Sequence, residues 1–514
     1  MSAYTFELSR RSEKYGVVAE THEGGLAYVV DPWTRLVRFL VLGSDGGTFY
    51  VSERELTKQS AQVVLDCLAD DGLRVVEAIV RISDGGLAPK RQPVLFALAL
   101  AAADGNASVR RAALDAVPVV CRTGTDLFTF VGYADALRGW GRGLRRAVAD
   151  WYERGTERDL IYQAIKYQQR GGWSHRDLLR LSHPMAATER RGDVYRWIAT
   201  GTVAESLSGS QIAAMAGLRD ATDAEAARII ALWKLPREAV PTRLLRSAAV
   251  WEALLADMPL AALIRNLGTM SKVGLLMLGS CSEQHVLDQL GSAERIERSR
   301  VHPMAILLAL TTYARGGGYR SKECWAVNRH IVDALDAAFY TAFGNVAPTN
   351  KRLLVAVDSS GSMTNACIAG TPLSALQASA AMALVTVAVE PRAEVISFDT
   401  KVRAWALSRR QRLDDVMAAL GRGGGTDLSL PWGYAMHDRV PYDGIVVYTD
   451  SEDGYGSVPQ ARRGYRNRCP EVRECVVATT ATQYSAVDGP LSLNVVGFDA
   501  STPQVVSGFL AGAL

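Results

Sequence analysis

The chain has 514 residues, more than the ~250–300 at which a single hydrophobic core stops growing, so we expect more than one domain. Hydrophobic residues make up 48% and charged residues 22%, the balance of a globular protein, and the net charge is only +3. No stretch reaches the ~18 apolar residues of a membrane span, and the N-terminus lacks the apolar core of a signal peptide. Seven scattered cysteines without a CxxC pair predict reduced thiols in a cytoplasmic protein.

The first two thirds of the chain are predicted to be mostly helical. Residues 1–60 contain short strand-like and turn-like pieces. From about Ser60 to Gly344, apolar residues recur at three- and four-residue spacing and alanine is abundant, which predicts helices. Segment 93–117 predicts two antiparallel helices joined by a turn at 104–106. We therefore expect irregular helix pairs of the HEAT-repeat kind, which stack into a curved solenoid with an extended concave surface.

The last third of the chain has a different pattern. Residues 346–350, VAPTN, are the expected boundary, which divides the chain into domains 1–345 and 346–514. Beyond it, strands are predicted at 352–357, 394–398, 444–449, 472–478 and 492–497, and helices at 373–389 and 411–420. Apolar strands that alternate with helices predict a doubly wound α/β domain, so the fold class is an α-helical repeat part joined to a Rossmann-like part.

Oxygen-bearing side chains follow the predicted strands of this second domain. An Asp-x-Ser-x-Ser triplet ends the first strand, a threonine lies in the glycine-rich loop RGGGTDL, and an aspartate ends the run GIVVYTD. The five candidate ligands are Asp358, Ser360, Ser362, Thr426 and Asp450. Such hard oxygen ligands suit a small divalent cation such as Mg²⁺. The triplet alone is also common in ordinary turns and caps, but the ordered set of five resembles the metal-ion-dependent adhesion site of von Willebrand factor type A (vWA) domains.

The expected role of this metal site is docking. Open α/β sheets bind ligands at the carboxyl ends of their strands, and mostly neutral hydroxyl ligands leave a cation electrophilic, with a free position. In vWA domains a carboxylate of a partner protein typically fills that position. Hydrolysis would instead need a metal-bound water and a general base. Asp427 and Glu452 are candidates for such a base, but no motif places either one.

Basic residues concentrate in segment 138–180, which contains ten Lys and Arg and five acidic residues. Such a stripe suits a polyanion such as RNA, although it is also typical of a solvated helix face. Lys166 and Arg170 lie four residues apart, which predicts that they share one helix face. Three tryptophans in or beside this segment either stack on bases or belong to the core. They are Trp140, Trp151 and Trp173.

Long blocks of the sequence resemble the Ro autoantigen family, in which a TROVE module (telomerase, Ro and vault) precedes a vWA domain. The blocks are YVVDPWTRLVRFLVLGSDGGTFY (28–50), WGRGLRRAVADWY (140–152), GGWSHRDLLRLSHP (171–184), MPLAALIRNLGTM (258–270), VHPMAILLAL (301–310) and LDAAFYTAFGNVAPTNKRLL (335–354). They run in the family's order over essentially the whole chain. High alanine, arginine and glycine usage and the lack of a eukaryotic-style extension indicate a bacterial member.

The resemblance implies a monomeric ring of HEAT-like helices that the vWA domain closes, with a hole of single-strand width. It implies a non-enzymatic protein of RNA quality control or decay. Small noncoding Y RNAs bind the outer basic surface in this family, and the hole holds single-stranded 3′ ends of misfolded RNAs. In bacteria, such proteins partner a 3′ exonuclease, polynucleotide phosphorylase, with Y RNA as the tether.

The family's Y RNA contacts involve the block 162–183. The residues expected to contact RNA here are Lys166, Gln169, Arg170, His175, Arg176 and His183. Lysine can act as a point charge on phosphate, whereas arginine can grip it with two hydrogen bonds. Other members tend to have a basic residue where this chain has Gln168, which weakens the expected contact with an RNA duplex. His183 is equally compatible with a cap at a helix end.

Two other classes of function stay open at this point. One is a docking scaffold in which the metal site recruits a protein and RNA is incidental. The other is an enzyme, either a metal-dependent nuclease or the vWA subunit of a chelatase. The chain has no GxxxxGK(S/T) loop, so a chelatase would need a separate ATPase. A nuclease should show clustered acidic and histidine ligands, which the helical part of the sequence lacks.

Overall fold

The structure is a computed structural model that describes residues 18–20, 26–28, 31–44, 48–50, 56–319, 322–368, 370–420, 423–438, 440–450, 458–479, 487, 489 and 491–513. The chain divides into two compact units. The helical unit contains residues 39–41 and 56–285, and the α/β unit contains residues 1–38, 42–55 and 286–514. Across the described residues, no helix has both the length and the apolar character that crossing a membrane requires.

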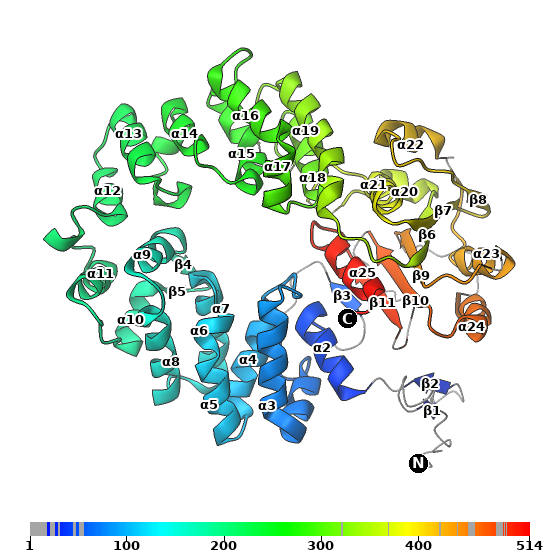
Figure 1. The fold of residues 1–514 in the computed structure, drawn as a ribbon, viewed down its shortest axis with the longest axis horizontal. Helices are drawn as coiled ribbons and strands as arrows, with labels where there is room; N and C mark the ends of the chain where they lie inside the picture. The colour runs from blue at the N-terminus through cyan, green and yellow to red at the C-terminus, as the bar shows by residue number, and fades with distance from the viewer. Residues whose placement is uncertain are drawn as a thin grey trace. The chain divides into compact units, whose positions relative to one another are not determined.

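The helical unit consists of short helices that pack against their neighbours (Figure 1). Its helices are α3 (Gln62–Asp84), α4 (Gln92–Asp104), α5 (Ala107–Asp115), α6 (Val117–Val120), α7 (Gly124–Arg138), α8 (Arg142–Glu153), α9 (Glu157–Lys166), α10 (His175–Ser182), α11 (Glu189–Thr200), α12 (Gln211–Gly217), α13 (Asp223–Trp233), α14 (Ala248–Leu255) and α15 (Leu260–Lys272). A two-stranded hairpin, β4 (Gln169–Arg170) and β5 (Trp173–Ser174), separates α9 from α10. Helix α16 (Cys281–Gly291) crosses the boundary between the units.

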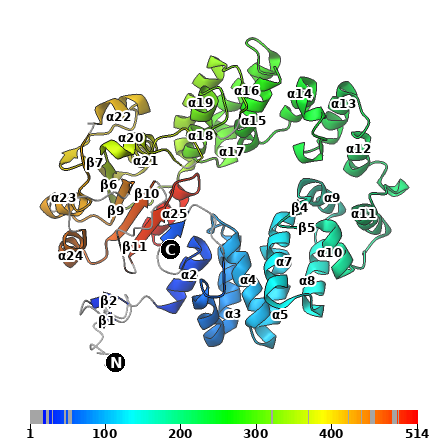
Figure 2. The same cartoon turned by 180° about the vertical axis from the view of Figure 1, so that it is seen from behind.

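The helix pair predicted at 93–117 is confirmed as α4 and α5. Asn106 caps α5, since its side-chain oxygen accepts the backbone amides of Ser108 and Val109 at 3.1 and 3.0 Å. Gly105 precedes it because a Cβ at this position would lie 2.6 Å from the carbonyl oxygen of Ala101. The chain can therefore reverse tightly, and α4 packs between α3 and α7 in both views (Figure 2).

The α/β unit contains the predicted doubly wound sheet. Among the described residues, seven strands lie in the order β3-β11-β10-β9-β6-β7-β8. They are β3 (Thr48–Tyr50), β6 (Arg352–Asp358), β7 (Arg392–Phe398), β8 (Val402–Ala404), β9 (Gly444–Thr449), β10 (Arg473–Ala478) and β11 (Ser492–Val496). All neighbouring pairs are parallel except β7 with β8. The five strands expected from the sequence are confirmed, within two residues at either end.

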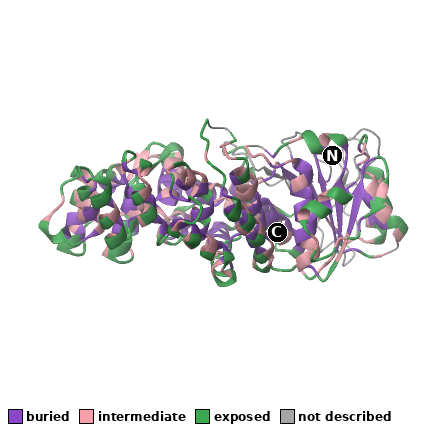
Figure 3. Cartoon of the chain, turned by 90° about the horizontal axis from the view of Figure 1, so that it is seen from above, coloured by how far each residue is buried: buried purple, intermediate pink, exposed green. Residues whose placement is uncertain are grey.

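Helices cover the sheet of the α/β unit (Figure 3). They include α20 (Gly361–Asn365), α21 (Ala375–Val389), α22 (Leu413–Ala419), α23 (Leu430–Asp438), α24 (Val458–Arg468) and α25 (Thr502–Ala511). Leu354 and Ala356 of β6 share a buried core with Trp432 of α23 and Tyr465 of α24. Leu353 points to the other face, beside Leu510 of α25. Successive residues of β6 thus serve opposite cores, which is why the strand is apolar throughout.

The remaining elements of the α/β unit come from the N-terminal segment and from the chain before residue 346. They are β1 (Val18–Glu20), β2 (Leu26–Tyr28), α17 (Ala293–Ser299), α18 (Pro303–Ala314), α19 (Arg329–Thr341) and the 3₁₀ turn η4 (Ala342–Asn345). Helix α2 (Pro32–Leu42) is divided between the two units, since its residues 39–41 belong to the helical unit. Segment 32–42 is helical, so the strand-like expectation was wrong there. Asp31 begins α2 by accepting the amides of Trp33 and Thr34 at 3.0 and 3.1 Å.

Two contacts explain why these early segments belong to this unit. Strand β3 lies parallel to β11 at the edge of the sheet, with Phe49 opposite Val495 (Figure 1). Helix α19 contacts the α/β domain through Tyr340, whose hydroxyl accepts the amide of Leu413 at 2.8 Å. The main segment of this compact unit begins at residue 286, whereas the boundary at 346 rests on the sequence pattern and stays a prediction.

A buried ion cluster holds α24 against the sheet. Glu474 of β10 has no exposed surface, and its carboxylate pairs with Arg462 and Arg466 of α24 at 2.9 and 2.6 Å. The indole of Trp432 donates a further hydrogen bond of 2.8 Å to the same carboxylate. Removal of one member of such a cluster leaves buried charge uncompensated, so each member is costly to lose.

We expect Glu474→Ala to lower the free energy of unfolding by about 3–5 kcal/mol, because two arginines lose their buried partner. Urea denaturation of the full chain, with hydrogen exchange of the β10 segment, measures this loss. Glu294→Ala is the matched control, since Glu294 pairs with Arg298 at 2.6 Å on an open surface. That surface pair should contribute less than about 1 kcal/mol. Equal losses for the two variants would contradict the structural role of Glu474.

Candidate nucleic-acid interface and metal site

The block predicted to contact RNA folds as helix, hairpin and helix. Helix α9 ends at Lys166, the hairpin turns at Gly171 and Gly172 with φ of +56° and +82°, and α10 begins at His175. Two consecutive positive φ angles favour glycine, which is why the chain reverses at this pair. Both strands of the hairpin pack beside α7.

Lys166 and Arg170 do not share a helix face, so that expectation was wrong. Lys166 is the last residue of α9, whereas Arg170 lies in β4, opposite Trp173 of β5. The physical reason is that helical geometry already ends at Tyr167, with φ of −119° and ψ of +70°, and the hairpin that turns at the two glycines then takes Arg170 into β4. Gln169 and Arg170 are both exposed on the hairpin. The two cations are therefore presented by different backbone elements.

Lys166 already has an acidic neighbour. Its Nζ lies 3.0 Å from Oε2 of Glu238, with side-chain exposures of 30% and 39%. The amide of Gln168 donates to the backbone carbonyl of the same glutamate at 3.0 Å. A phosphate that approaches Lys166 must compete with this carboxylate, so Lys166 is a weaker phosphate contact than its charge alone indicates.

His175 lies in the core of the helical unit, not on its surface. Its side chain is 3% exposed, and its Nδ1 lies 2.7 Å from the hydroxyl of Tyr152. The ring of Phe128 packs against it at a centroid distance of 4.7 Å. Burial lowers the pKa of His175 to about 4, so the ring is neutral near pH 7. The expectation of an RNA contact at His175 is therefore corrected, because a neutral buried ring cannot reach phosphate.

Arg176 and His183 lie at opposite ends of α10. Arg176 is exposed in the first turn, and no described residue forms a hydrogen bond or ion pair with its guanidinium. His183 is exposed and ends the helix in the left-handed region with φ of +47°, where its amide donates to the carbonyl of Leu179 at 3.0 Å. The cap at His183 is thus confirmed, while its side chain stays free to meet a ligand.

The basic stripe at 138–180 contains charges with different roles. Arg154 is a structural residue, since it donates to the carbonyls of Pro118 and Arg122 and lies 4.6 Å above the ring of Trp151. Trp151 is buried and donates to the carbonyl of Cys121 at 2.7 Å. It is therefore a core residue and not a stacking platform for bases. Trp140 and Trp173 are half-buried and pack on each other at 5.8 Å. Only part of the stripe is therefore available to a polyanion.

The carboxyl ends of β6 and β9 bring the two aspartates of the candidate metal site together. Asp358 is fully buried, and it accepts the hydroxyl of Thr449 at 2.7 Å and the amide of Ser360 at 2.9 Å. Asp450 directly follows Thr449 and is 6% exposed. The pKa of Asp358 is raised to about 6, chiefly by burial and also by the nearby charge of Asp450, while the hydrogen bonds from Ser360 and Thr449 act in the opposite direction.

Backbone hydrogen bonds join the two hydroxyl-bearing loops. The amide of Gly361 donates to the carbonyl of Gly424 at 3.3 Å, and Gly423 donates back to Ser359 at 3.0 Å. Thr426 on the second loop is 4% exposed, while the hydroxyls of Ser360 and Ser362 lie 3.1 Å apart. Gly423 is required because a Cβ there would lie 2.3 Å from the carboxylate of Asp399. The structure thus gathers the loops that carry all five predicted ligands.

The residues at this position fit a hard divalent cation. Two buried carboxylates repel each other there, and three hydroxyl oxygens complete an all-oxygen donor set. Within the described residues, no group of three or more His, Cys, Asp or Glu side chains that could hold a metal ion is found, so this candidate depends on hydroxyl ligands beside its two carboxylates. Asp427 is occupied as a cap, since it accepts the amide and hydroxyl of Ser429 at 2.9 and 2.6 Å. Glu452, the other candidate base, lies outside the described residues.

Sequence reasoning missed Thr449, which is the residue that links β9 to Asp358. The sequence feature that could have pointed to Thr449 is its position directly before Asp450, at the end of an apolar strand. The hydroxyl of Ser359 was also missed, and it donates to the carbonyl of Phe398 at 3.1 Å. Both residues hold the ends of neighbouring strands in place around the two aspartates.

Comparisons with known proteins agree with this architecture. A model of the TROVE domain matches residues 19–211 and 233–351, and a model of the Ro60 vWA domain matches residues 352–510. The chain is 40% identical over 505 residues to the RNA-binding protein RO60 of Deinococcus radiodurans, covering 95% of this chain and 94% of that protein. It is 30% identical over 583 residues to the RNA-binding protein RO60 of Caenorhabditis elegans, covering 96% and 90%.

A solved structure extends the likeness to three dimensions. The crystal structure of the Deinococcus radiodurans Ro (RSR) protein matches with a TM-score of 0.87 at 39% identity, covering 94% of this chain and all of that one. The fold and these matches place the chain in the class of proteins that join a helical TROVE module to a vWA domain. The chain belongs to the Ro60 family within that class, which confirms the resemblance found in the sequence.

Proposed function

We propose that this chain is a non-enzymatic RNA-binding protein that holds a small noncoding, Y-like RNA on the surface around the β4–β5 hairpin. The observation that carries this proposal is its identity of 40% over nearly its full length to a protein named for RNA binding. Exposed Arg170 and Arg176 on the hairpin and α10 support it, since guanidinium groups suit phosphate. The RNA surface is defined here by Lys166, Gln169, Arg170, Arg176 and His183.

The proposal includes finer features that the resemblance implies. The helical repeats and the vWA domain close a monomeric ring, whose hole receives the single-stranded 3′ end of a misfolded RNA. A 3′ exonuclease such as polynucleotide phosphorylase acts with the ring in RNA quality control in the cytoplasm. Stacked helix pairs of the kind seen in the helical unit form extended concave surfaces, which supports this arrangement.

Replacing Lys166 and Arg170 together with Ala should weaken binding of a structured RNA by about 1–3 kcal/mol and flatten its salt dependence, because two phosphate contacts are lost. Fluorescence anisotropy at several salt concentrations measures both effects. Lys234→Ala is the matched control, since Lys234 is also ion-paired, with Asp257 at 3.2 Å, but lies outside the RNA surface. An unchanged salt slope in the double variant would refute the assignment of this surface.

An RNA duplex with a single-stranded 3′ end should compete better than the same duplex with blunt ends, because only the former can enter a hole of single-strand width. Competition against a labelled RNA measures the difference. A duplex with the same overhang at its 5′ end controls for added length and charge. Equal competition by the 3′ and 5′ overhangs would argue against the proposed role of the hole.

A second candidate function is docking of a protein partner through a metal ion. The gathering of two buried carboxylates and three hydroxyls at the carboxyl ends of β6 and β9 favours it. These side chains would hold a divalent cation, probed best with Mg²⁺, through Asp358, Ser360, Ser362, Thr426 and Asp450. The cation would supply an electrophilic position for a carboxylate of the partner, which neutral hydroxyl ligands do not saturate.

Asp450→Asn should lower Mg²⁺ affinity by about tenfold or more. Loss of a group that only hydrogen-bonds to a metal ligand already has an effect of this size, and Asp450 is proposed to be a ligand itself. Isothermal titration calorimetry of the purified chain measures this directly. Asp443→Asn is the control, since Asp443 lies near the opposite ends of the strands, where it accepts the amide of Arg352 at 2.7 Å. An identical isotherm for Asp450→Asn and the unmodified chain would rule out the metal site.

A further inference from the structure

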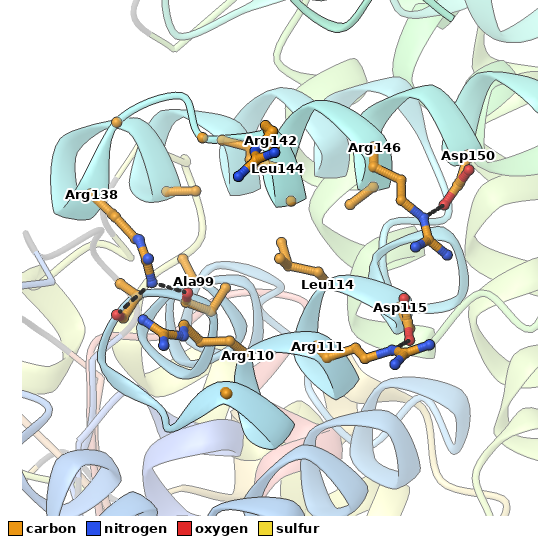
Figure 4. Close-up of a pocket in the computed structure, with 18 residues that line it drawn as sticks. Ala99, Arg110, Arg111, Leu114, Asp115, Arg138, Arg142, Leu144, Arg146 and Asp150 are labelled. Carbon is orange, nitrogen blue, oxygen red and sulfur yellow. Dashed lines mark hydrogen bonds and ion pairs between the residues drawn. The ribbon is translucent and has the colours of Figure 1, made fainter. Parts of the chain in front are cut away.

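A groove in the helical unit has a lining rich in arginine (Figure 4). It lies among α4, α5, α7 and α8, and its volume is about 400 Å³. Alanine and leucine side chains form part of its lining, including Leu114 and Leu144. The arginines that line it are Arg110, Arg111, Arg138, Arg142 and Arg146. We call it the arginine groove. Its arginines belong to three helices, α5, α7 and α8, so no single stretch of sequence reveals it.

The charges in the arginine groove are not balanced. Two aspartates also line it, and each pairs with an arginine of its own helix. Arg111 lies 3.8 Å from Asp115, and Arg146 lies 3.6 Å from Asp150, in exposed pairs that bind weakly. Five guanidinium groups therefore share two carboxylates, which leaves a positive excess inside a concave surface.

Arg110, Arg138 and Arg142 account for that excess. Arg138 donates to the carbonyls of Ala102 and Ala103 at 3.5 and 3.3 Å, which directs it across the groove towards the end of α4 (Figure 4). These neutral partners leave its charge uncompensated. Among the residues that the structure describes, the guanidinium groups of Arg110 and Arg142 have no hydrogen-bond or ion-pair partner. Both are therefore available to a ligand with negative charge.

The start of α8 adds to the positive character of the groove. Gly141, at the N-cap, supplies no side-chain acceptor, and the first turn contains no acidic residue. The first backbone amides of α8 thus lack the usual side-chain partner, and the positive end of the helix dipole lies at the groove. Gly143 lets α8 approach α5 closely, because a Cβ there would lie 2.8 Å from Leu114.

We propose that the arginine groove binds backbone phosphates of RNA as a second anchoring site, apart from the RNA surface around the hairpin. Guanidinium groups bind phosphate oxygens in pairs of hydrogen bonds, which matches the partner-free Arg110 and Arg142. None of the eighteen lining residues is aromatic, so the groove offers bases nothing to stack on and contacts the backbone alone. This inference rests on the proposed RNA-binding function.

The salt dependence of RNA binding tests the groove. Arg110→Gln and Arg142→Gln, alone and combined, should each lower the slope of log K against log salt by about 0.7–0.9, since each removes one phosphate contact. Arg145→Gln is the matched control, because Arg145 lies on the same helix α8, is exposed and does not line the groove. Thermal unfolding by circular dichroism shows whether the variants are folded.

The outcomes separate this inference from the proposed function. If the unmodified chain binds RNA and Arg142→Gln changes the slope no more than Arg145→Gln, the groove is part of a diffuse field and the inference is overturned. If the unmodified chain binds no RNA, the proposed function fails and the inference fails with it. Larger slope changes for the groove variants than for Arg145→Gln support the inference.

A second probe distinguishes an RNA backbone from a small free anion, which shares the same phosphate chemistry. Sodium tripolyphosphate is titrated by calorimetry into the unmodified chain and the Arg110→Gln/Arg142→Gln variant, and is also added as a competitor of RNA. Competition that disappears in the double variant, with RNA binding tighter than tripolyphosphate binding, supports backbone recognition. Tight tripolyphosphate binding that leaves RNA affinity unchanged would assign the groove to a small anion and overturn the RNA inference.

Discussion

The parallel pairing of β6 with β7 and β9 is the constraint on which the α/β unit depends. Parallel strands in register end at one edge of the sheet, so the residues that follow them must meet there. Asp358 and Thr449 contact each other for this reason, although 91 positions separate them in the chain. The same sheet receives β3 from the N-terminal segment, which makes the edge strand of this domain a distant part of the sequence.

The candidate metal site is a consequence of that geometry and of the loops that it brings together. Asp358 is held by Thr449 and by the amide of Ser360, and the glycine-rich loop is held by backbone hydrogen bonds to residues 359 and 361. Two carboxylates buried side by side are unfavourable without a cation, as the raised pKa of Asp358 indicates. The pair is therefore electrostatically unfavourable as a purely structural feature, which is the physical basis of the proposal that a cation binds there.

In the helical unit, the same kind of residue serves two opposite purposes. Arg191 is buried and donates to the carbonyls of Tyr152 and Gly155, so its charge stabilises the backbone at a helix end. Arg176 is exposed and has no hydrogen-bond or ion-pair partner in the part of the chain that the structure describes, so its charge is available to a ligand. A count of basic residues along the sequence cannot separate these roles. The difference depends on which carbonyl groups and carboxylates the fold places within reach.

The sequence by itself determined the helical part, the five central strands and the strand-end positions of the five candidate oxygen ligands, because the period of hydrophobic residues and the motifs at strand ends are local features. Tertiary structure decided the rest. Helix α9 ends at Lys166 and Arg170 lies in the hairpin that follows it, while packing against Phe128 and Tyr152 buries His175. The arginine groove joins side chains of separate helices. Such features depend on contacts between residues far apart in the chain, which local patterns do not encode.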